Sequence, residues 1–420
     1  MKYFRELDIG YFEDALVFLD IDGTLTADKS KSIGKHEREK VEEIKKVAKE
    51  IFLVSNGLPE RTKEIAGSLG VSNILTGHSK PNPKVLNKLH HNGGIVVGDK
   101  FMTDGLLSVF TGLPFLKVKN ILHEKEGLAN RGIYFIDNFL FYLFETIRAI
   151  RVKQWVKNLL IFAPLFFAGK FFDLSLEYSS FLAFLAFSFS ASIVYLINDF
   201  LDKENDKLHP KKKWRSIPMG NLGIVDINVL IMLLGLSCIF VLFFVPQIIP
   251  YLAGYIVFNI AYSAVLKNIP VYDIVSVALM YLFRVVVGGV AVGIFVSPWL
   301  LVCTFFSALF LITAKRYSEF EHPTRKVLKH YSKEAVSAML QISAALSVMS
   351  YAIYSAIGSS IKGIEYTTVI VTAVFMIILN DIYRGNKIIE SPEIYLMKNR
   401  KINILIFIWI LIVAYLIYHS

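Results

Sequence analysis

The stretch Ser192–Asp206, SIVYLINDFLDKEND, decides the fold of the larger part of this chain. It begins as an apolar segment typical of a membrane helix and ends in three aspartates, Asp199, Asp202 and Asp206. Spacings of three and four residues place these acids on one helical face. Acids at a membrane boundary are functional by default, with a solvated acidic face as the alternative. Because three carboxylates repel one another unless a cation lies among them, we expect Mg²⁺ bridging a diphosphate here.

The composition extends this membrane character to most of the chain. The 420 residues are 54% hydrophobic and 14% aromatic, which is too apolar for an ordinary soluble protein. The two cysteines, Cys238 and Cys303, lie in apolar runs without metal-type spacing and are expected to be small residues of membrane helices. The N-terminus lacks the charged-then-apolar pattern of a signal peptide, so residues 1–118 are expected to stay on the side where they are made.

Nine segments approach the length of about 20 apolar residues that a membrane span needs. They lie near residues 155–169, 177–197, 225–245, 247–266, 272–296, 298–314, 335–357, 366–382 and 403–418. We therefore expect an all-α transmembrane bundle of about nine helices over 151–420. Lys and Arg concentrate in the loops 198–222, 315–334 and 383–402, which predicts that these loops and the N-terminal part face the cytosol. This asymmetry accounts for much of the net charge of +10 without nucleic acid, for which the sequence shows no motif.

The N-terminal part alternates strand-like and helix-like segments. The strand-like runs are Ala15–Asp20, Ile51–Val54, Asn73–Leu75, Gly94–Gly98 and Leu113–Lys117, and the charged helical stretches include Gly34–Glu50 and Pro59–Leu69. This alternation predicts a small α/β, Rossmann-like domain over residues 1–118, with a parallel sheet and helices on both faces. In such sheets the chemistry lies at the carboxyl ends of the strands.

Those strand ends carry acids and phosphate-binding groups. They are Asp20, Asp22, Ser55, Asp99 and Asp104, and Lys80 opens the next helix. Phosphate-ester hydrolysis needs a carboxylate nucleophile, an acid for the leaving oxygen, Mg²⁺, and donors for the phosphoryl oxygens. By chemistry alone, Asp20 would attack, Asp22 would protonate the leaving group and later activate water, and Asp99 would help to hold Mg²⁺. Ser55 and Lys80 would bind the phosphate, with Lys84 as an alternative to Lys80.

The order of these motifs, DxDGT, Ser, Lys and GDxxxTD, resembles the haloacid dehalogenase (HAD) phosphatase superfamily over about one hundred residues. The resemblance implies a metal site formed by Asp20, Asp22 and Asp99 with support from Asp104. Only a loop and one charged helix separate Thr24 from Ser55, which predicts a HAD domain without a cap. Such an open site could admit a phosphate carried on a lipid headgroup. A catalytically inactive domain kept for folding or docking is the alternative.

The segment 119–150 links the two parts. It mixes apolar residues such as Phe135, Ile136, Phe139 and Leu143 with basic ones. This pattern predicts an amphipathic helix that lies on the membrane surface before the first span, with a plain linker helix as the alternative.

Basic residues recur on the cytosolic side of the predicted bundle. They are Lys212, Lys213, Arg215, Lys267, Arg284, Lys315 and Arg316, and they accompany Tyr262 and the acid Asp273, which is expected to hold metal. Singly, most of these bases are explained as positive-inside anchors. Arg284 differs because it lies within a span, where an arginine needs an anionic partner in the bundle.

The spans, the NDxxDxxxD cluster and Tyr-Ser-x-x-Leu-Lys before Asp273 resemble the UbiA superfamily of intramembrane prenyltransferases. The runs that look most like its decaprenyl-phosphate phosphoribosyltransferase branch are Gln154–Asn158, His209–Arg215, Lys315–Glu319 and Pro392–Glu393. The second acid motif of ordinary members is reduced to Asp273, with Val277 four residues on. The chain also departs from the branch, with Ser216 in place of a usual proline and Asn399 in place of an acid.

The branch resemblance implies that 5-phosphoribosyl pyrophosphate (PRPP) binds through Mg²⁺ to Asp199, Asp202 and Asp206, with Asn198 assisting. The phosphate of a polyprenyl phosphate would attack the anomeric carbon of PRPP as pyrophosphate leaves. The basic residues would hold the phosphates, and an apolar groove would hold the lipid tail. The HAD domain would then remove the 5-phosphate, which gives polyprenyl-phosphoryl ribose in a prokaryotic cell membrane. One alternative is a prenyl-diphosphate transferase for an aromatic or glycerol-phosphate acceptor. Another is a lipid-binding or transport protein with an inactive phosphatase domain.

Overall fold

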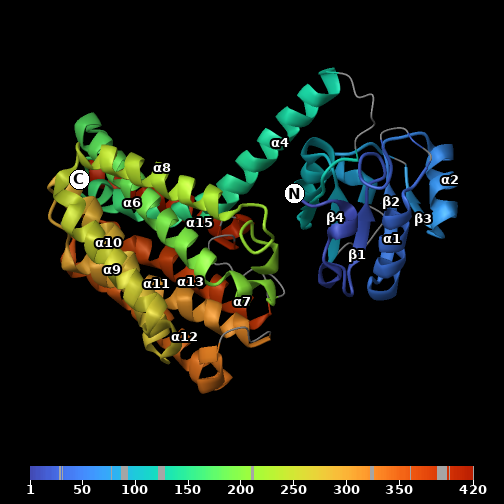
Figure 1. Ribbon diagram of the computed structural model, residues 1–420. Helices are drawn as coiled ribbons and strands as arrows, with labels where there is room; N and C mark the ends of the chain where they lie inside the picture. The colour runs from blue at the N-terminus through green and yellow to red at the C-terminus, as the bar shows by residue number, and fades with distance from the viewer. Residues whose placement is uncertain are drawn as a thin grey trace. The chain divides into compact units, whose positions relative to one another are not determined.

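The chain folds into two compact units (Figure 1). In the N-terminal unit, Met1–Arg148 is joined by Pro210–Gly223, and the membrane unit contains Ala149–His209 and Ile224–Ser420. This computed structural model describes residues 1–27, 30, 32–76, 78–86, 93–121, 128–209, 212–321, 326–359, 361–385, 395–396 and 398–419. The N-terminal unit thus extends beyond residue 118 and takes in part of a loop that the sequence assigns to the transmembrane domain.

A five-stranded parallel sheet forms the centre of the N-terminal unit and confirms the predicted strands. The strands are β1 (Leu16–Leu19), β2 (Glu50–Val54), β3 (Asn73–Leu75), β4 (Gly94–Gly98) and β5 (Phe115–Lys117). Their spatial order is β3-β2-β1-β4-β5, with β1 in the middle. Because parallel sheets are covered on both faces, the central strands are nearly continuous apolar runs. Successive side chains of β1 point to opposite faces of the sheet, so they enter different cores. Val17 and Leu19 pack in one core, and Phe18 packs in the other.

Short helices and turns surround this sheet. They are η1 (Phe4–Glu6), η2 (Ile9–Tyr11), α1 (Lys35–Val47), α2 (Pro59–Leu69), η3 (Pro83–Leu86), η4 (Phe101–Gly105), α3 (Leu106–Thr111), α4 (Leu128–Ala149) and η6 (Lys212–Trp214). The first two predicted helices are confirmed as α1 and α2. The linker segment is also helical, as α4, and its buried Phe141 packs in one of the two cores of this unit. The placement of α4 on a membrane surface stays a prediction.

Seven helices of the described part of the membrane unit are long and apolar enough to cross a bilayer. They are α6 (Leu174–Leu201), α8 (Ile224–Leu242), α10 (Tyr272–Val292), α11 (Pro298–Ser318), α12 (Lys333–Ile353) continued by η11 (Tyr354–Gly358), α13 (Thr368–Tyr383) preceded by η12 (Ile364–Thr367), and α15 (Arg400–His419). Shorter elements are η5 (Val152–Phe162), α5 (Ala163–Phe167), α7 (Lys203–Lys207), η7 (Pro246–Ile248), α9 (Ile249–Ala264), η8 (Leu266–Asn268), η9 (Glu319–Glu321) and η10 (Lys326–His330).

Among the described residues, seven helices rather than the predicted nine are long and apolar enough to span a membrane. The segment 155–169 forms η5 and α5, and Pro164 lies in the first turn of α5, where its missing N–H is tolerated. The segment 247–266 forms α9, which has 16 residues and falls below the length of a full span. Both segments are apolar enough, but the backbone breaks or stops before a single helix reaches across.

Gly288 allows the irregular segment η5 to pack closely on α10. A Cβ atom at this position would lie 2.0 Å from the carbonyl oxygen of Ile161, which is backbone and cannot rotate away. The close approach matters because Asn158, on the same segment, contacts Arg284 of α10.

We predict that Gly288→Ala destabilises the membrane unit by about 1–3 kcal/mol, the usual cost of overpacking. The matched control is Gly235→Ala in α8, where a Cβ atom would meet nothing within 4 Å. Thermal unfolding of the detergent-solubilised protein should show a lower midpoint for the first variant only. Equal midpoints for the two variants would contradict the close approach.

Candidate functional site

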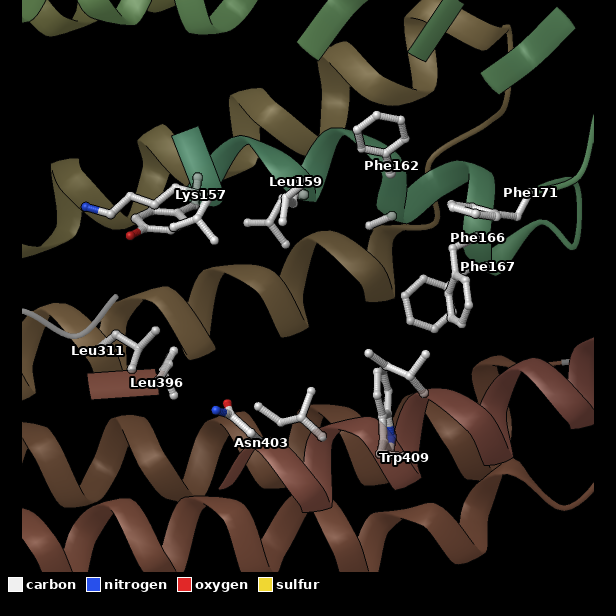
Figure 2. A pocket seen from close by; sticks show the side chains of 16 residues that line it. Lys157, Leu159, Phe162, Phe166, Phe167, Phe171, Leu311, Leu396, Asn403 and Trp409 are labelled. Carbon is white, nitrogen blue, oxygen red and sulfur yellow. The ribbon is translucent and has the colours of Figure 1, made fainter. Parts of the chain in front are cut away.

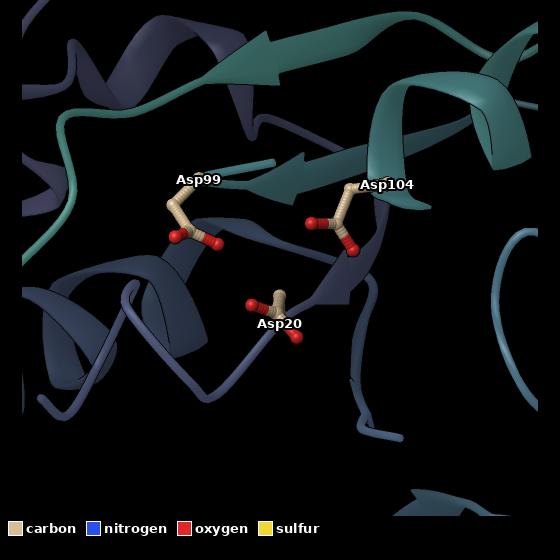
Figure 3. Close-up of side chains that lie close together, drawn as sticks. All are labelled: Asp20, Asp99 and Asp104. Atoms are coloured by element: carbon tan, nitrogen blue, oxygen red, sulfur yellow. The ribbon is translucent and has the colours of Figure 1, made fainter. Parts of the chain in front are cut away.

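Three buried aspartates meet at the carboxyl ends of the central strands of the N-terminal unit (Figure 3). Asp20 follows β1, Asp99 follows β4, and Asp104 lies in η4. Their carboxylate oxygens lie within 4.8 Å of one another, and no other set of three acidic, His or Cys side chains approaches so closely among the described residues. Parallel topology produces this meeting, because it places the ends of β1 and β4 side by side.

Lys80 lies between two of these acids. Its Nζ donates hydrogen bonds to Asp20 and, at 2.6 Å, to Asp104. Asn56 fixes the backbone of Lys80 on both sides: the Lys80 N–H donates to the Asn56 side chain at 2.7 Å, and the Asn56 amide donates to the Lys80 carbonyl at 3.1 Å. Lys84, the alternative in the sequence, is exposed on η3. The sequence analysis gave Asn56 no role, although it directly follows the predicted phosphate-binding residue Ser55.

Asp22 does not belong to the three-acid group. Its carboxylate forms an ion pair with Arg61 of α2 at 2.8 Å. Arg61, to which sequence reasoning gave no role, also donates to Thr26 at 3.2 Å. The Ser55 hydroxyl accepts a hydrogen bond from the Gly57 N–H at 2.9 Å. The site therefore places a cation, Arg61, beside the predicted acid for the leaving group.

One carboxylate oxygen of Asp99 accepts hydrogen bonds, and the other has no partner. Oδ2 accepts hydrogen bonds from the Asn120 side chain at 2.5 Å and the Tyr134 hydroxyl at 3.1 Å. Oδ1 is buried and has no hydrogen-bond partner. A buried carboxylate oxygen without a partner, next to two further carboxylates, fits an oxygen-coordinated divalent cation such as Mg²⁺.

The charge balance of the cluster agrees with this assignment. Burial and the neighbouring Asp104 raise the pKa of Asp99 to about 6, and the same two causes raise the pKa of Asp20 well above its usual value. Burial alone would lower the pKa of Lys80, but the carboxylates of Asp104 and Asp20 raise it above its usual value. Three carboxylates share one lysine, so the cluster has an acidic excess that a divalent cation would neutralise.

The raised pKa of Asp99 predicts a pH-dependent response to Mg²⁺. Without metal, the Asp99 carboxyl keeps its proton up to about pH 6 in the folded state, whereas in the unfolded state it loses the proton near pH 3.8. The free energy of unfolding therefore falls as the pH rises through this window. Mg²⁺ binds the deprotonated form and should raise the midpoint of thermal unfolding more at pH 7.5 than at pH 5. Asp99→Asn should remove most of this difference. An equal Mg²⁺ effect at both pH values would contradict the assignment.

In the membrane unit, the predicted acidic cluster spans a break between two helices. α6 ends at Leu201, Asp202 lies between the helices, and Asp206 is buried in α7. Asp199 forms an ion pair with Arg151 at 2.5 Å. Arg151 has a φ of +55°, which is uncommon for a residue other than glycine, and its guanidinium lies over the ring of Tyr195. Strained backbone of this kind is found most often at functional sites.

Arg284 is buried in α10 and has neutral partners in the described part of the chain. Its Nε donates to the Asn158 side chain at 2.8 Å, and Nη1 donates to the carbonyl of Met280 at 2.6 Å. The guanidinium also lies over the rings of Phe187, Tyr255 and Tyr281. Among the described residues, the anionic partner expected from the sequence is replaced by an amide, a carbonyl and aromatic faces, which suit a weakly hydrated guanidinium. Its positive charge stays available to an anionic ligand.

Asp273 pairs with Arg316 instead of lying with the other acids. Oδ2 accepts a hydrogen bond from Arg316 at 2.7 Å, and Oδ1 accepts one from the Tyr331 hydroxyl at 2.7 Å. Arg316 also pairs with Glu319 at 3.0 Å. Asp273 was expected to bind metal and Arg316 to bind substrate, but both oxygens of Asp273 are occupied by this network. The pair ties α10 to α11 where both reach the predicted cytosolic side.

We predict that Asp273→Asn and Arg316→Gln each lower the stability of the protein in the presence of EDTA. Removal of one partner of a buried ion pair costs about 3–5 kcal/mol. Because both variants break the same pair, the double variant should be more stable than the sum of the single effects implies. Thermal unfolding midpoints of the four proteins measure this. Additive losses would show that the two residues act independently.

The remaining predicted residues are divided between the units. Lys212, Lys213 and Arg215 belong to the N-terminal unit, where Lys213 donates to the Gly10 carbonyl at 3.2 Å. In the membrane unit, Asn198 lies on α6, Tyr262 on α9, Lys267 in η8 and Lys315 on α11. Pro392 and Glu393 lie outside the described residues.

Residues 212–223 are held to the N-terminal unit by aromatic and polar contacts. Trp214 contacts Tyr11, with ring centroids 5.5 Å apart. The buried Glu145 of α4 accepts hydrogen bonds from the Ser216 hydroxyl, through its carbonyl, and from the Asn221 amide, through its carboxylate. This packing places a basic segment of the chain, predicted for the transferase site, on the unit that carries the three-acid cluster.

An apolar cavity of about 640 Å³ lies within the membrane unit (Figure 2). Its walls come from η5, α5, α10, α11 and α15, with contributions such as Phe162, Phe166, Leu311 and Trp409. Figure 2 shows Lys157 at one end and Phe171 at the other. A long apolar cavity with a cation at one end fits an isoprenoid chain that carries an anionic head.

These features describe a helical membrane unit with an apolar cavity. The model of the UbiA prenyltransferase family matches residues 159–393, so the chain belongs to this family. The described part of the bundle has the same fold as a UbiA homolog from Archaeoglobus fulgidus solved with GPP and Mg²⁺, with a TM-score of 0.52 and 19% identity over 66% of this chain and 100% of the other.

Two curated relatives are named decaprenyl-phosphate phosphoribosyltransferase. The chain is 33% identical to that of Corynebacterium glutamicum over 219 residues, which covers 50% of this chain and 66% of the relative. It is 28% identical to that of Mycobacterium tuberculosis over 275 residues, which covers 63% of this chain and 91% of the relative. The family and its relatives support a multi-pass membrane enzyme of the prenyltransferase type.

Proposed function

We propose that the membrane unit transfers the 5-phosphoribosyl group of PRPP to a polyprenyl phosphate, and that the N-terminal unit hydrolyses the 5-phosphate of the product. The observation that carries this proposal is the apolar cavity with Lys157 at one end, in a unit related to decaprenyl-phosphate phosphoribosyltransferases. The product of the two steps is polyprenyl-phosphoryl ribose in a prokaryotic cell membrane, with both sites on the cytosolic side.

In the transfer step, an oxygen of the lipid phosphate forms a bond to the anomeric carbon of the ribose. The bond from that carbon to pyrophosphate breaks, and its electron pair leaves with pyrophosphate. Asp199, Asp202 and Asp206 are the carboxylates proposed to hold Mg²⁺ with PRPP, and Asn198 assists them. Arg151, which pairs with Asp199, is in place to neutralise that acid when no metal is bound. Mg²⁺ supplies charge neutralisation for the leaving pyrophosphate.

The remaining cations are proposed to bind the phosphate groups of the two substrates. Lys267, Arg284 and Lys315 lie in the membrane unit, and Arg284 has its guanidinium at Asn158 and a set of aromatic rings. Positive charge that is fixed before reaction is worth several kcal/mol when charge develops on a leaving group. Asp273 and Arg316 are proposed to fix the helix ends rather than to bind ligands, because they satisfy each other.

In the hydrolytic step, the N-terminal unit is proposed to act as a HAD phosphatase without a cap. An Asp20 oxygen attacks phosphorus, the ester oxygen leaves with a proton from Asp22, and water then releases phosphate from Asp20. Lys80 lies against Asp20 and is in place to bind the phosphoryl oxygens with Ser55. Asp99, with its spare oxygen, and Asp20 would hold Mg²⁺, which offsets the charge of the phosphate. Arg61 keeps Asp22 oriented through its ion pair.

The test supplies the purified full-length protein in nanodiscs with ribose-labelled PRPP and polyprenyl phosphate. We predict that the wild type forms dephosphorylated ribosyl lipid, that Asp20→Asn accumulates the 5-phosphorylated lipid, and that Asp199→Asn forms at least 100-fold less labelled lipid, the order of effect seen when a major electrostatic group is removed. Lipids are separated by chromatography and identified by mass spectrometry.

Two variants serve as controls. Asp14→Asn changes an exposed acid of the N-terminal unit whose φ of +51° asparagine tolerates. Asp173→Asn changes the N-cap at the opposite end of α6, where asparagine caps as well as aspartate. Both should behave as wild type. Absence of labelled lipid with the wild type, or a prenylated aromatic acceptor in its place, would overturn the transfer step. Complete dephosphorylation by Asp20→Asn would overturn the coupling of the two units.

A further inference from the structure

α4 presents two unlike faces. Tyr134, Asp137, Phe141 and Glu145, spaced three or four residues apart, point into the N-terminal unit. Asp137 accepts hydrogen bonds from the backbone N–H groups of Phe101 and Met102, and it pairs with the buried Lys117. These contacts fix the helix against the edge of the sheet where β5 lies. The orientation of α4 on its own unit is thereby determined.

The opposite face of α4 is a continuous apolar stripe. Its residues are Phe135, Ile136, Phe139, Leu143 and Ile147, which are between 45% and 75% exposed. Their spacing follows the helical period, so they form one surface and are not scattered. A contiguous exposed surface of this kind on a folded unit marks an interaction site, because single exposed apolar residues are common but stripes are not.

The chain itself indicates what covers this stripe. α4 ends at Ala149, the residue at which the membrane unit begins, and only Ile150 and Arg151 separate it from η5. A helix with a packed polar side, an exposed aromatic and aliphatic side, and a direct covalent continuation into membrane helices is suited to lie in the interface of a bilayer. A lipid surface is therefore the occupant that the connectivity favours.

The first turns of α4 connect this stripe to the acidic cluster. Tyr134 directly precedes Phe135 and Ile136, and its hydroxyl donates to Oδ2 of Asp99 at 3.1 Å. Lys100 lies over the Tyr134 ring, 5.0 Å from its centroid, which fixes the ring from the other side. Oδ1 of Asp99 is the buried oxygen that has no partner. Tyr134 thus holds one oxygen of a carboxylate whose other oxygen has no partner, as outer groups orient metal ligands.

We propose that α4 is a membrane-seated part of the phosphatase-like site: its apolar face lies in the bilayer surface, and Tyr134 on its other face positions Asp99 for a divalent cation. The site would then act on phosphate monoesters carried on membrane lipids. This inference rests on the proposed phosphatase function. Tyr134 is a positioning residue, since it contacts Asp99 and not the phosphate.

The location of α4 is tested by fluorescence quenching in the full-length protein. The two native cysteines are replaced by alanine, and a bimane label is attached to Phe139→Cys in nanodiscs of phosphatidylcholine. Brominated phosphatidylcholine should quench this label strongly. The matched control is Gly67→Cys on α2, an exposed position where a side chain meets nothing within 4 Å and quenching should be absent. Equal, weak quenching at both positions would show that lipid does not cover the stripe.

The positioning role is tested with Tyr134→Phe, which removes one hydroxyl and keeps the ring. Mn²⁺ binding is followed by electron paramagnetic resonance in the Asp199→Asn background, which weakens the second proposed metal site. We expect about tenfold weaker binding at the N-terminal site, the lower end of the range for losses of groups that orient metal ligands. Tyr142→Phe removes a hydroxyl from the same helix away from Asp99 and should bind as the parent does. Equal affinities for the two variants would overturn the role of Tyr134.

Hydrolysis of p-nitrophenyl phosphate separates this inference from the proposed function. If the wild type hydrolyses p-nitrophenyl phosphate and Tyr134→Phe requires about tenfold more Mg²⁺ for half-maximal rate, the phosphatase function and the role of Tyr134 are both supported. If the wild type is inactive at every Mg²⁺ concentration, the phosphatase function fails, whereas the quenching and Mn²⁺ results still decide the seating of α4 and the role of Tyr134.

Discussion

A charged side chain that is removed from water needs an opposite charge or a full set of hydrogen-bond partners, and this requirement shapes both units of the protein. In the N-terminal unit, Lys80 lies between Asp20 and Asp104. In the membrane unit, Arg316 meets Asp273 and Glu319. Apart from the local pair of Arg316 and Glu319, these contacts join segments that are distant in the sequence, so the positions of the strand ends and the helix ends depend on them.

Some buried charges in the two units have a full set of partners and others do not, and this difference determines which of them could bind a ligand. Asp273 has a partner for each oxygen, which makes its network a structural anchor between α10 and α11. Asp99 has partners for one oxygen only, and the acids around it outnumber the single lysine. Arg284 is buried among neutral groups. Asp99 could therefore accept a cation, and Arg284 could accept a phosphate, without the loss of a strong ion pair.

The sequence predicted the elements whose signal is local. The five strands of the N-terminal sheet were correctly placed because buried parallel strands are short apolar runs bounded by polar turns. Membrane helices were recognised by length and apolarity, but two of the nine segments proved too short or broken, because proline and local backbone geometry decide where a helix stops. Membership in the UbiA family followed from a dense acidic motif at a helix end, which is a local signal as well.

By itself, then, the sequence determined a parallel α/β unit joined to a membrane bundle and identified Asp20, Asp99 and Lys80, since each lies beside a recognisable strand end or turn. Only the tertiary structure decided which groups orient the acids that the sequence predicted for the two sites. Arg61 lies 39 residues from Asp22, and Arg151 lies 48 residues from Asp199. Tyr134 reaches Asp99 from a helix that the sequence predicted to lie on the membrane surface. Such pairings depend on how elements pack in three dimensions, and the periodicity of a single segment contains no information about them.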